Sequence, residues 1–140
     1  MTQQMESSVE LRDFMLQLYQ TMSNDAAGFA RYVSQQPGVV AIGTAPEEWW
    51  SDHATISRIF KTQFEELGSF SVVEANPQAY RAGNVGWVAD RATLRLADRT
   101  EVPFRLTVVL LQEQGEWQIA QWHASIGISN QEAIGQELTV

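Results

Sequence analysis

The stretch VGWVADRATLRLADRTEVPFRLTVVLLQEQGEWQIAQWHAS, residues 85–125, decides the fold class of this chain. Its β-branched and aromatic residues follow the two-residue period of strands. Turn residues interrupt the pattern at 98–101 and again at Gln114 and Gly115. We predict strands near residues 85–97, 102–112 and 116–126, preceded by a strand at 70–80. Because the connections are short, these strands should form an antiparallel meander.

The residues before this stretch show helical spacing. Apolar residues recur every three or four positions from Val9 to Met22, which predicts an amphipathic helix. A second, shorter helix should carry Phe29 and Tyr32, and a third should end at Gly68. Helices followed by consecutive strands are typical of the α+β class, so we predict one domain spanning 1–140, with three N-terminal helices packed on an antiparallel sheet.

Smaller features complete the expected organisation. Ser51 or Asp52 should cap the third helix, and a brief strand should occupy residues 39–42. Ser129 and Glu132 match a capping box for a last short helical turn.

Composition excludes several classes of function. The chain has 140 residues and a net charge of −8, which disfavours nucleic acid and anionic membranes as partners. It contains no Cys, so disulfides, thiolate catalysis and cysteine-based zinc sites are excluded. No secretion signal and no apolar run long enough to span a membrane are evident, so we expect a soluble, cytoplasmic protein.

Pairing the predicted hairpins assigns side chains to the two faces of the sheet. A hairpin that turns at residues 98–101 places Asp90 opposite Val108. A hairpin that turns at Gln114 and Gly115 places Leu106 opposite His123. The expected inner face is then mostly apolar, and Asp90 is its only acid. Its members are Val88, Asp90, Ala92, Leu94, Leu96, Val102, Phe104, Leu106, Val108, Leu110, Trp117, Ile119, Gln121, His123 and Ser125.

The opposite, outer face combines aromatic, aliphatic and arginine side chains, as protein interfaces do. We therefore predict a homodimer through it. A slip of one residue in either hairpin would exchange the faces of the strands that follow. The expected members are Trp87, Arg91, Thr93, Arg95, Arg105, Thr107, Val109, Leu111 and Trp122.

Three features together resemble a known family: helices before a curved sheet, the segment AIGTAPEEWWSDH at residues 41–53, and the ending GEWQIAQWHAS at residues 115–125. The chain resembles the SnoaL-like branch of the nuclear transport factor 2-like superfamily over nearly its whole length. The resemblance implies a cone-shaped α+β barrel, often dimeric, whose sheet curls around a pocket. Members include ketosteroid isomerases, polyketide cyclases and dehydratases, and fold alone does not choose among them.

The resemblance and the inner face together suggest a site in a hydrophobic pocket for a small apolar molecule. Ketosteroid isomerases use an Asp base with a Tyr and a protonated Asp, whereas only one inner carboxylate is evident here. As in the cyclases, Asp90 would transfer a proton and His123 would assist it, so these two residues are the expected catalytic pair. Metal and cofactors are not expected, because one His and one Asp make a poor metal site. The expected ligand-binding residues are Gln121, Trp50, Tyr32 and Ser125.

Each role has a structural alternative. Asp90 could instead cap a turn or pair with an arginine, and His123 could bind a backbone carbonyl. One of Trp49 and Trp50 could line the pocket mouth while the other fixes the entry of the third helix. Two functions therefore stay open: an isomerase, cyclase or dehydratase acting by proton transfer, and a non-catalytic ligand-binding or dimerisation module.

Overall fold

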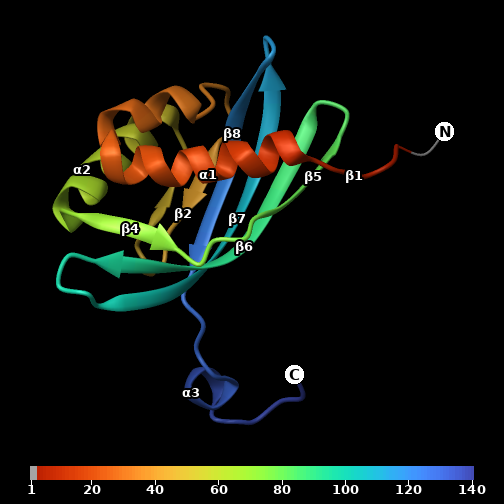
Figure 1. Cartoon of the computed structure of the whole chain (residues 1–140). Coiled ribbons are helices and arrows are strands. Elements are labelled where there is room, and N and C mark those ends of the chain that lie inside the picture. Colours follow the sequence, from red (N-terminus) through yellow and green to blue (C-terminus); the bar gives the residue numbers. More distant parts are fainter. Residues whose placement is uncertain (1–2) are drawn as a thin grey trace.

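The computed structural model describes residues 3–140 and has helices packed on one curved sheet (Figure 1). The elements in chain order are β1 (Glu6–Ser7), α1 (Val9–Asn24), the 3₁₀ helix η1 (Ala26–Tyr32), β2 (Val40–Ile42), β3 (Trp49–Trp50), α2 (His53–Leu67), β4 (Phe70–Val73), β5 (Gln78–Ala82), β6 (Val85–Leu96), β7 (Glu101–Glu113), β8 (Glu116–Ser125) and α3 (Asn130–Ile134). The three N-terminal helical elements and the long strands match the predicted order, and the cone-shaped α+β fold is confirmed.

The sheet is open and mixed rather than purely antiparallel. Its eight strands run in the order β1-β5-β6-β7-β8-β2-β3, with β4 also paired to β6. All pairs are antiparallel except β2 with β8, which are parallel. The predicted strand at 70–80 is divided in two, because Glu74 adopts a positive φ of 58° and the chain leaves the ladder until Gln78. β4 and β5 then pair with successive parts of β6.

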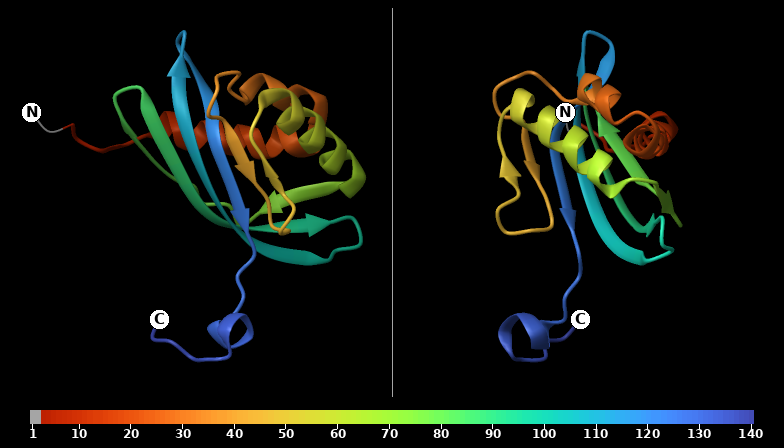
Figure 2. Two further views of the ribbon diagram at one scale, coloured as in Figure 1. Left: turned by 180° about the vertical axis from the view of Figure 1, so that it is seen from behind. Right: turned by 90° about the vertical axis from the view of Figure 1, so that its left-hand side faces the viewer.

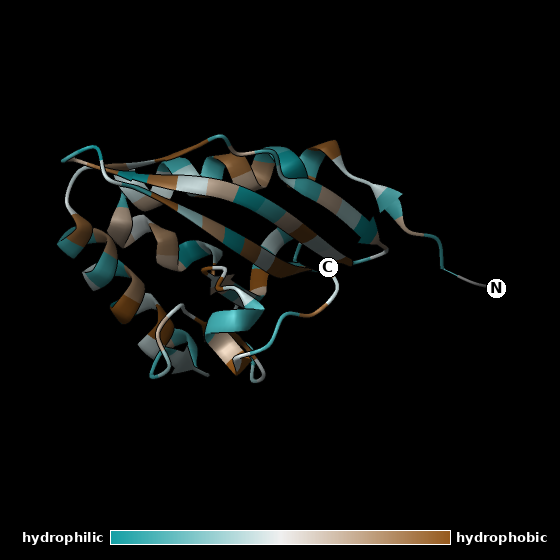
Figure 3. Cartoon of the chain, turned by 90° about the horizontal axis from the view of Figure 1, so that it is seen from below, coloured by the Kyte–Doolittle hydropathy of each residue, from teal (hydrophilic) through white to brown (hydrophobic). Residues whose placement is uncertain are grey.

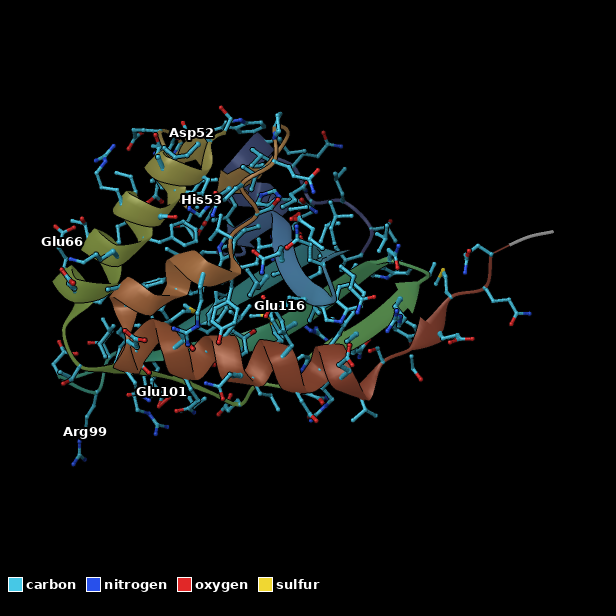
Figure 4. All side chains as sticks on the ribbon, turned by 90° about the horizontal axis from the view of Figure 1, so that it is seen from above. Asp52, His53, Glu66, Arg99, Glu101 and Glu116 are labelled. Carbon is cyan, nitrogen blue, oxygen red and sulfur yellow. The ribbon has the colours of Figure 1, made fainter. Side chains whose placement is uncertain are left out.

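The helices cover the concave face of the sheet, as the two views of Figure 2 show. α1 begins at the cap Ser8, whose side chain accepts a hydrogen bond from the Leu11 N–H, and it buries one apolar stripe. α2 begins at the cap Asp52, which Figure 4 shows beside His53, and it ends at Gly68 with a φ of 71°. Phe29 of η1 contacts both Phe60 and Trp122, which joins the helices to β8. Among the described residues, no helix combines the length and apolar character needed to cross a membrane.

A β-bulge in β8 changes the faces of its last residues. Leu110 pairs with Ile119, as predicted, but Val109 then pairs with Gln121, so Ala120 is an extra residue on β8. Beyond the bulge, Trp122 points inward and is 6% exposed, whereas His123 lies on the outer face and is exposed. The predicted faces of Gln121, Trp122, His123 and Ser125 are therefore wrong.

Candidate functional site

An apolar cavity of about 210 Å³ lies between α2 and the end of the sheet formed by β4, the β6–β7 hairpin and the end of β8. Its lining comes from six parts of the chain: α1, residues 43–48, α2, β4, the β6–β7 hairpin and residues 122–126. Aromatic and aliphatic side chains dominate it, among them Phe64, Leu94, Val102, Phe104, Trp122 and Ala124. Such a surface favours ligands that gain from leaving water.

One side of this apolar cavity is polar. Thr44, Glu48 and Gln63 contribute to its lining, and Glu48 is its only acid among the residues that the structure describes. Glu48 Oε1 accepts a hydrogen bond from the Ala45 N–H at 2.7 Å and a longer one from the Thr44 hydroxyl at 3.4 Å. Glu48 Oε2 accepts from Gln63 Nε2 at 2.7 Å. A carboxylate offers about four acceptor positions, so Glu48 retains room for one further donor.

Gly43 directly follows β2, and because it has no side chain, the Glu48 side chain lies against its backbone. A Cβ at position 43 would come within 2.8 Å of Glu48 Cβ and Oε1. No real side chain tolerates that separation, so any larger residue at position 43 would displace the Glu48 carboxylate.

Asp90 lies in the interior next to the helices. It is 6% exposed, and its Oδ2 accepts a hydrogen bond from the Tyr19 hydroxyl of α1 at 2.8 Å. Its Oδ1 accepts from the Asn76 N–H at 3.0 Å. Burial, followed by the hydrogen bond to Asp90, raises the pKa of Tyr19 well above its ordinary value.

The Tyr19–Asp90 pair does not line the apolar cavity. Phe104 lines that cavity and packs edge-on against the Tyr19 ring, with 6.4 Å between the ring centroids. Asp90 is absent from the lining of the apolar cavity, and its carboxylate accepts hydrogen bonds from two donors.

The other predicted site residues do not join Asp90. His123 is exposed on the outer face opposite Thr107, so the predicted Asp90–His123 pair is wrong, and the bulge at Ala120 is the reason. Gln121 is also exposed. Ser125 accepts a hydrogen bond from Arg105 Nε at 3.1 Å, again on the outer face.

The two predicted aromatic ligand contacts pack against helices. Trp50 lies edge-on to Phe60 of α2, with 6.0 Å between centroids, and Tyr32 lies edge-on to Phe14 of α1 at 5.5 Å. Neither belongs to the lining of the apolar cavity. Trp49 is 65% exposed.

A second depression, the outer hollow, has a volume of about 410 Å³. It lies where β6 has no neighbour between β4 and β5, and Asp90 contributes to it beside Asn76. Its rim carries Arg91, Arg105 and Thr107. Figure 3 shows apolar and hydrophilic residues alternating along the long strands, so the two faces of the sheet differ in polarity.

The comparisons with known proteins agree with the fold. The model of the SnoaL-like domain family matches residues 11–129. The chain belongs to the SnoaL-like family. The matched residues of this SnoaL-like chain include every strand from β2 to β8 and most of α1. No curated protein matches the chain.

Solved structures share the fold at low sequence identity. A nuclear transport factor 2-like protein of unknown function from Pseudomonas putida is 16% identical, with a TM-score of 0.75, over 95% of this chain and 96% of its own. A provisionally named ketosteroid isomerase from Parabacteroides distasonis is 15% identical, with a TM-score of 0.65, over 85% of this chain and 89% of its own. A domain of unknown function with a cystatin-like fold from Nostoc punctiforme is 14% identical, with a TM-score of 0.71, over 89% of this chain and 80% of its own. At these identities the likeness shows the fold alone.

Proposed function

We propose that this SnoaL-like protein binds a small, mostly apolar molecule in the apolar cavity, as a binding module rather than a proton-transfer enzyme. The observation that carries the proposal is the lining of the cavity, which is aromatic and aliphatic except at Thr44, Glu48 and Gln63. A largely apolar pocket with a few converging polar groups is the usual form of a small-molecule site.

The catalytic alternative lacks support from the same geometry. An acid–base catalyst must come within hydrogen-bond reach of the proton that it moves. Asp90 does not line the apolar cavity, and His123 is on the other face of the sheet, so neither would meet a ligand bound there. Glu48 is the acid that a ligand would meet, and its remaining acceptor position suits a ligand hydroxyl.

The cavity also limits the size of the ligand. Its volume of about 210 Å³ is below the roughly 300–1,000 Å³ typical of pockets for drug-sized molecules. A compact bicyclic molecule with one hydroxyl group is therefore a suitable probe, and 1-naphthol meets this description.

We expect Glu48→Gln to weaken the binding of 1-naphthol while leaving the binding of naphthalene nearly unchanged. A hydrogen bond to a charged acceptor is about twice as strong as a neutral one, so the loss for 1-naphthol should be about fivefold. Titration calorimetry of both probes against both proteins measures the effect. Equal losses for the two probes would assign Glu48 a structural role and would contradict its contact with the ligand.

We also propose that the chain forms a homodimer through the outer face of the sheet. Tyr80 stacks on Trp87, with 6.4 Å between ring centroids and 19° between planes, and Trp87 pairs across the strands with Val109. Tyr80 and Val85 are 37% and 39% exposed, so this apolar patch faces outward. Contiguous apolar surface of this kind supports an interface.

We expect Trp87→Glu to convert the dimer to a monomer. Burial of a carboxylate against the matching patch of the partner should raise the dissociation constant by about thirtyfold or more. Sedimentation velocity across a concentration series measures the change, with Glu66→Gln, an exposed residue of α2 that is labelled in Figure 4, as the control variant. A wild-type chain that stays monomeric at high micromolar concentration would contradict the dimer.

A further inference from the structure

The C-terminal arm, residues 127–140, leaves the end of β8 and runs away from the body of the molecule (Figure 1). It includes α3, which Ser129 caps and Gly135 ends in the left-handed conformation. Ile128 and Ile134 are 64% and 61% exposed, and Leu138 is 47% exposed. A helix of one turn is not stable in water by itself, so this ordered apolar segment is suited to packing against another surface.

The charge of the arm indicates which surface it fits. Residues 127–140 contain Glu132 and Glu137 and no basic residue. Most of the protein surface is unfavourable for this segment, because the whole chain carries a net charge of −8. A basic surface is needed.

The outer face holds two neighbouring arginines that form no salt bridge among the described residues. Arg91 and Arg105 are directly opposite each other on β6 and β7 and are exposed. Like charges directly opposite in a sheet are destabilising. Within residues 3–140, neither guanidinium has a carboxylate within 4.0 Å, whereas Arg95 on the same face is paired with Glu101. The Arg91–Arg105 pair therefore forms no salt bridge in the described part of the chain, although Glu74 lines the same depression as both arginines.

The arm starts beside this arginine pair. Ile126 and Gly127 line a depression together with Arg91 and Arg105, and a Cβ on Gly127 would lie 4.0 Å from Arg105 Cζ. In a two-fold dimer the same patch of both copies meets at the interface. The arm root of one copy would then face the arginine pair of the other.

We infer that, in the homodimer, the C-terminal arm of each copy crosses onto the outer face of its partner. Glu132 and Glu137 meet Arg91 and Arg105 at the outer hollow, and Ile128 and Ile134 pack on the sheet beside it. The partner is favoured over the arm's own sheet because the arm continues the direction of β8 away from its own body in both views of Figure 2. Residues 126–128, between the end of β8 and the cap Ser129, span only about 10 Å when extended. This length leaves little chain for the arm to turn back onto its own sheet. This inference rests on the proposed homodimer.

The absence of Cys in the chain makes a disulfide test possible. One full-length chain carries Gln131→Cys on the arm, and a second, size-tagged chain carries Ala89→Cys, an exposed outer-face position on the outer hollow. A matched control carries Asn84→Cys at the exposed β5–β6 turn. After mixing under mild oxidation, we expect the 131–89 disulfide between chains to form at least tenfold faster than the 131–84 disulfide.

Charge reversal provides a second, independent test. Arg91→Glu with Arg105→Glu should slow formation of the 131–89 disulfide about tenfold, and adding Glu132→Lys with Glu137→Lys should restore it. Sedimentation of the same samples reports whether dimers are present. Dimers whose 131–89 rate equals the control rate would overturn the arm crossing and leave the dimer standing, whereas monomers throughout would overturn both. A further chain carries both Gln131→Cys and Ala89→Cys. If its 131–89 disulfide forms within a monomer and not between chains, the arm covers its own sheet and the inference is overturned.

Discussion

Replacement of Ala124 by Trp is expected to abolish binding of 1-naphthol. Ala124 lies on the inner face of β8 beyond the bulge and lines the apolar cavity beside Phe104. An indole at this position would occupy the space of about 210 Å³ that the ligand needs. We expect affinity to fall by about a hundredfold or more, because a ligand without a pocket keeps little of its apolar burial.

The control for this variant is Ala54→Trp, which places the same indole on the exposed side of α2. Titration calorimetry measures affinity, and thermal unfolding checks that both variants are folded. A folded Ala124→Trp protein that still binds 1-naphthol with wild-type affinity would locate the ligand elsewhere and would contradict the proposed site.

Tyr19→Phe is expected to lower the free energy of unfolding by about 2 kcal/mol, because the buried Asp90 carboxylate loses its hydroxyl donor. Asp90→Leu should be destabilising as well, since it leaves the Tyr19 hydroxyl without an acceptor. The double variant should be more stable than the sum of the two losses predicts, with a coupling energy of about 1–2 kcal/mol. Urea denaturation of the four proteins closes the cycle. Additive losses would contradict the direct hydrogen bond.

The same pair makes a prediction on pH. The pKa of Tyr19 is raised above its ordinary value of 10.0, first by burial and then by Asp90. Above the ordinary pKa the unfolded chain therefore releases the tyrosine proton more readily than the folded chain, and stability falls as pH rises. The stability advantage of the wild type over Tyr19→Phe should be fully present at pH 9 and smaller at pH 11. Its persistence at pH 11 would contradict this account. Binding of 1-naphthol by Tyr19→Phe should stay within about twofold of wild type, because Tyr19 does not line the apolar cavity.

Much of the fold follows from periodicity, because the long elements carry strong patterns. The stripe on α1 and the alternation along β6 and β7 correctly place Asp90 and Leu106 on the inner face. The predicted register set Asp90 opposite Val108, whereas Asp90 pairs with Leu106. A shift of two residues keeps both side chains on the same face. No strand is predicted at β3, because two adjacent tryptophans carry no period. Its pairing with β2 depends on contacts that only the folded chain makes.

The site was harder to predict than the fold. One extra residue at Ala120 exchanged the faces of Trp122 and His123, and no local signal in an apolar-polar alternation distinguishes a bulge from a regular strand. No sequence motif at Glu48 distinguishes it from a charge exposed to solvent. Its role depends on Gly43 and Gln63, which the return of β3 along β2 and the packing of α2 bring to it. The one local signal is Gly43 itself, because a glycine at the end of a strand can mark a close approach by another group, here the Glu48 side chain.

The most direct test of the proposed function is an amide NMR titration of the full chain with 1-naphthol. We expect saturable changes in amide chemical shift that are largest at Phe64, Leu94 and Ala124, which line the apolar cavity, and at their neighbours. Shifts centred on Arg91 and Thr107 at the outer hollow, or no saturable shift at the solubility limit of the probe, would contradict it.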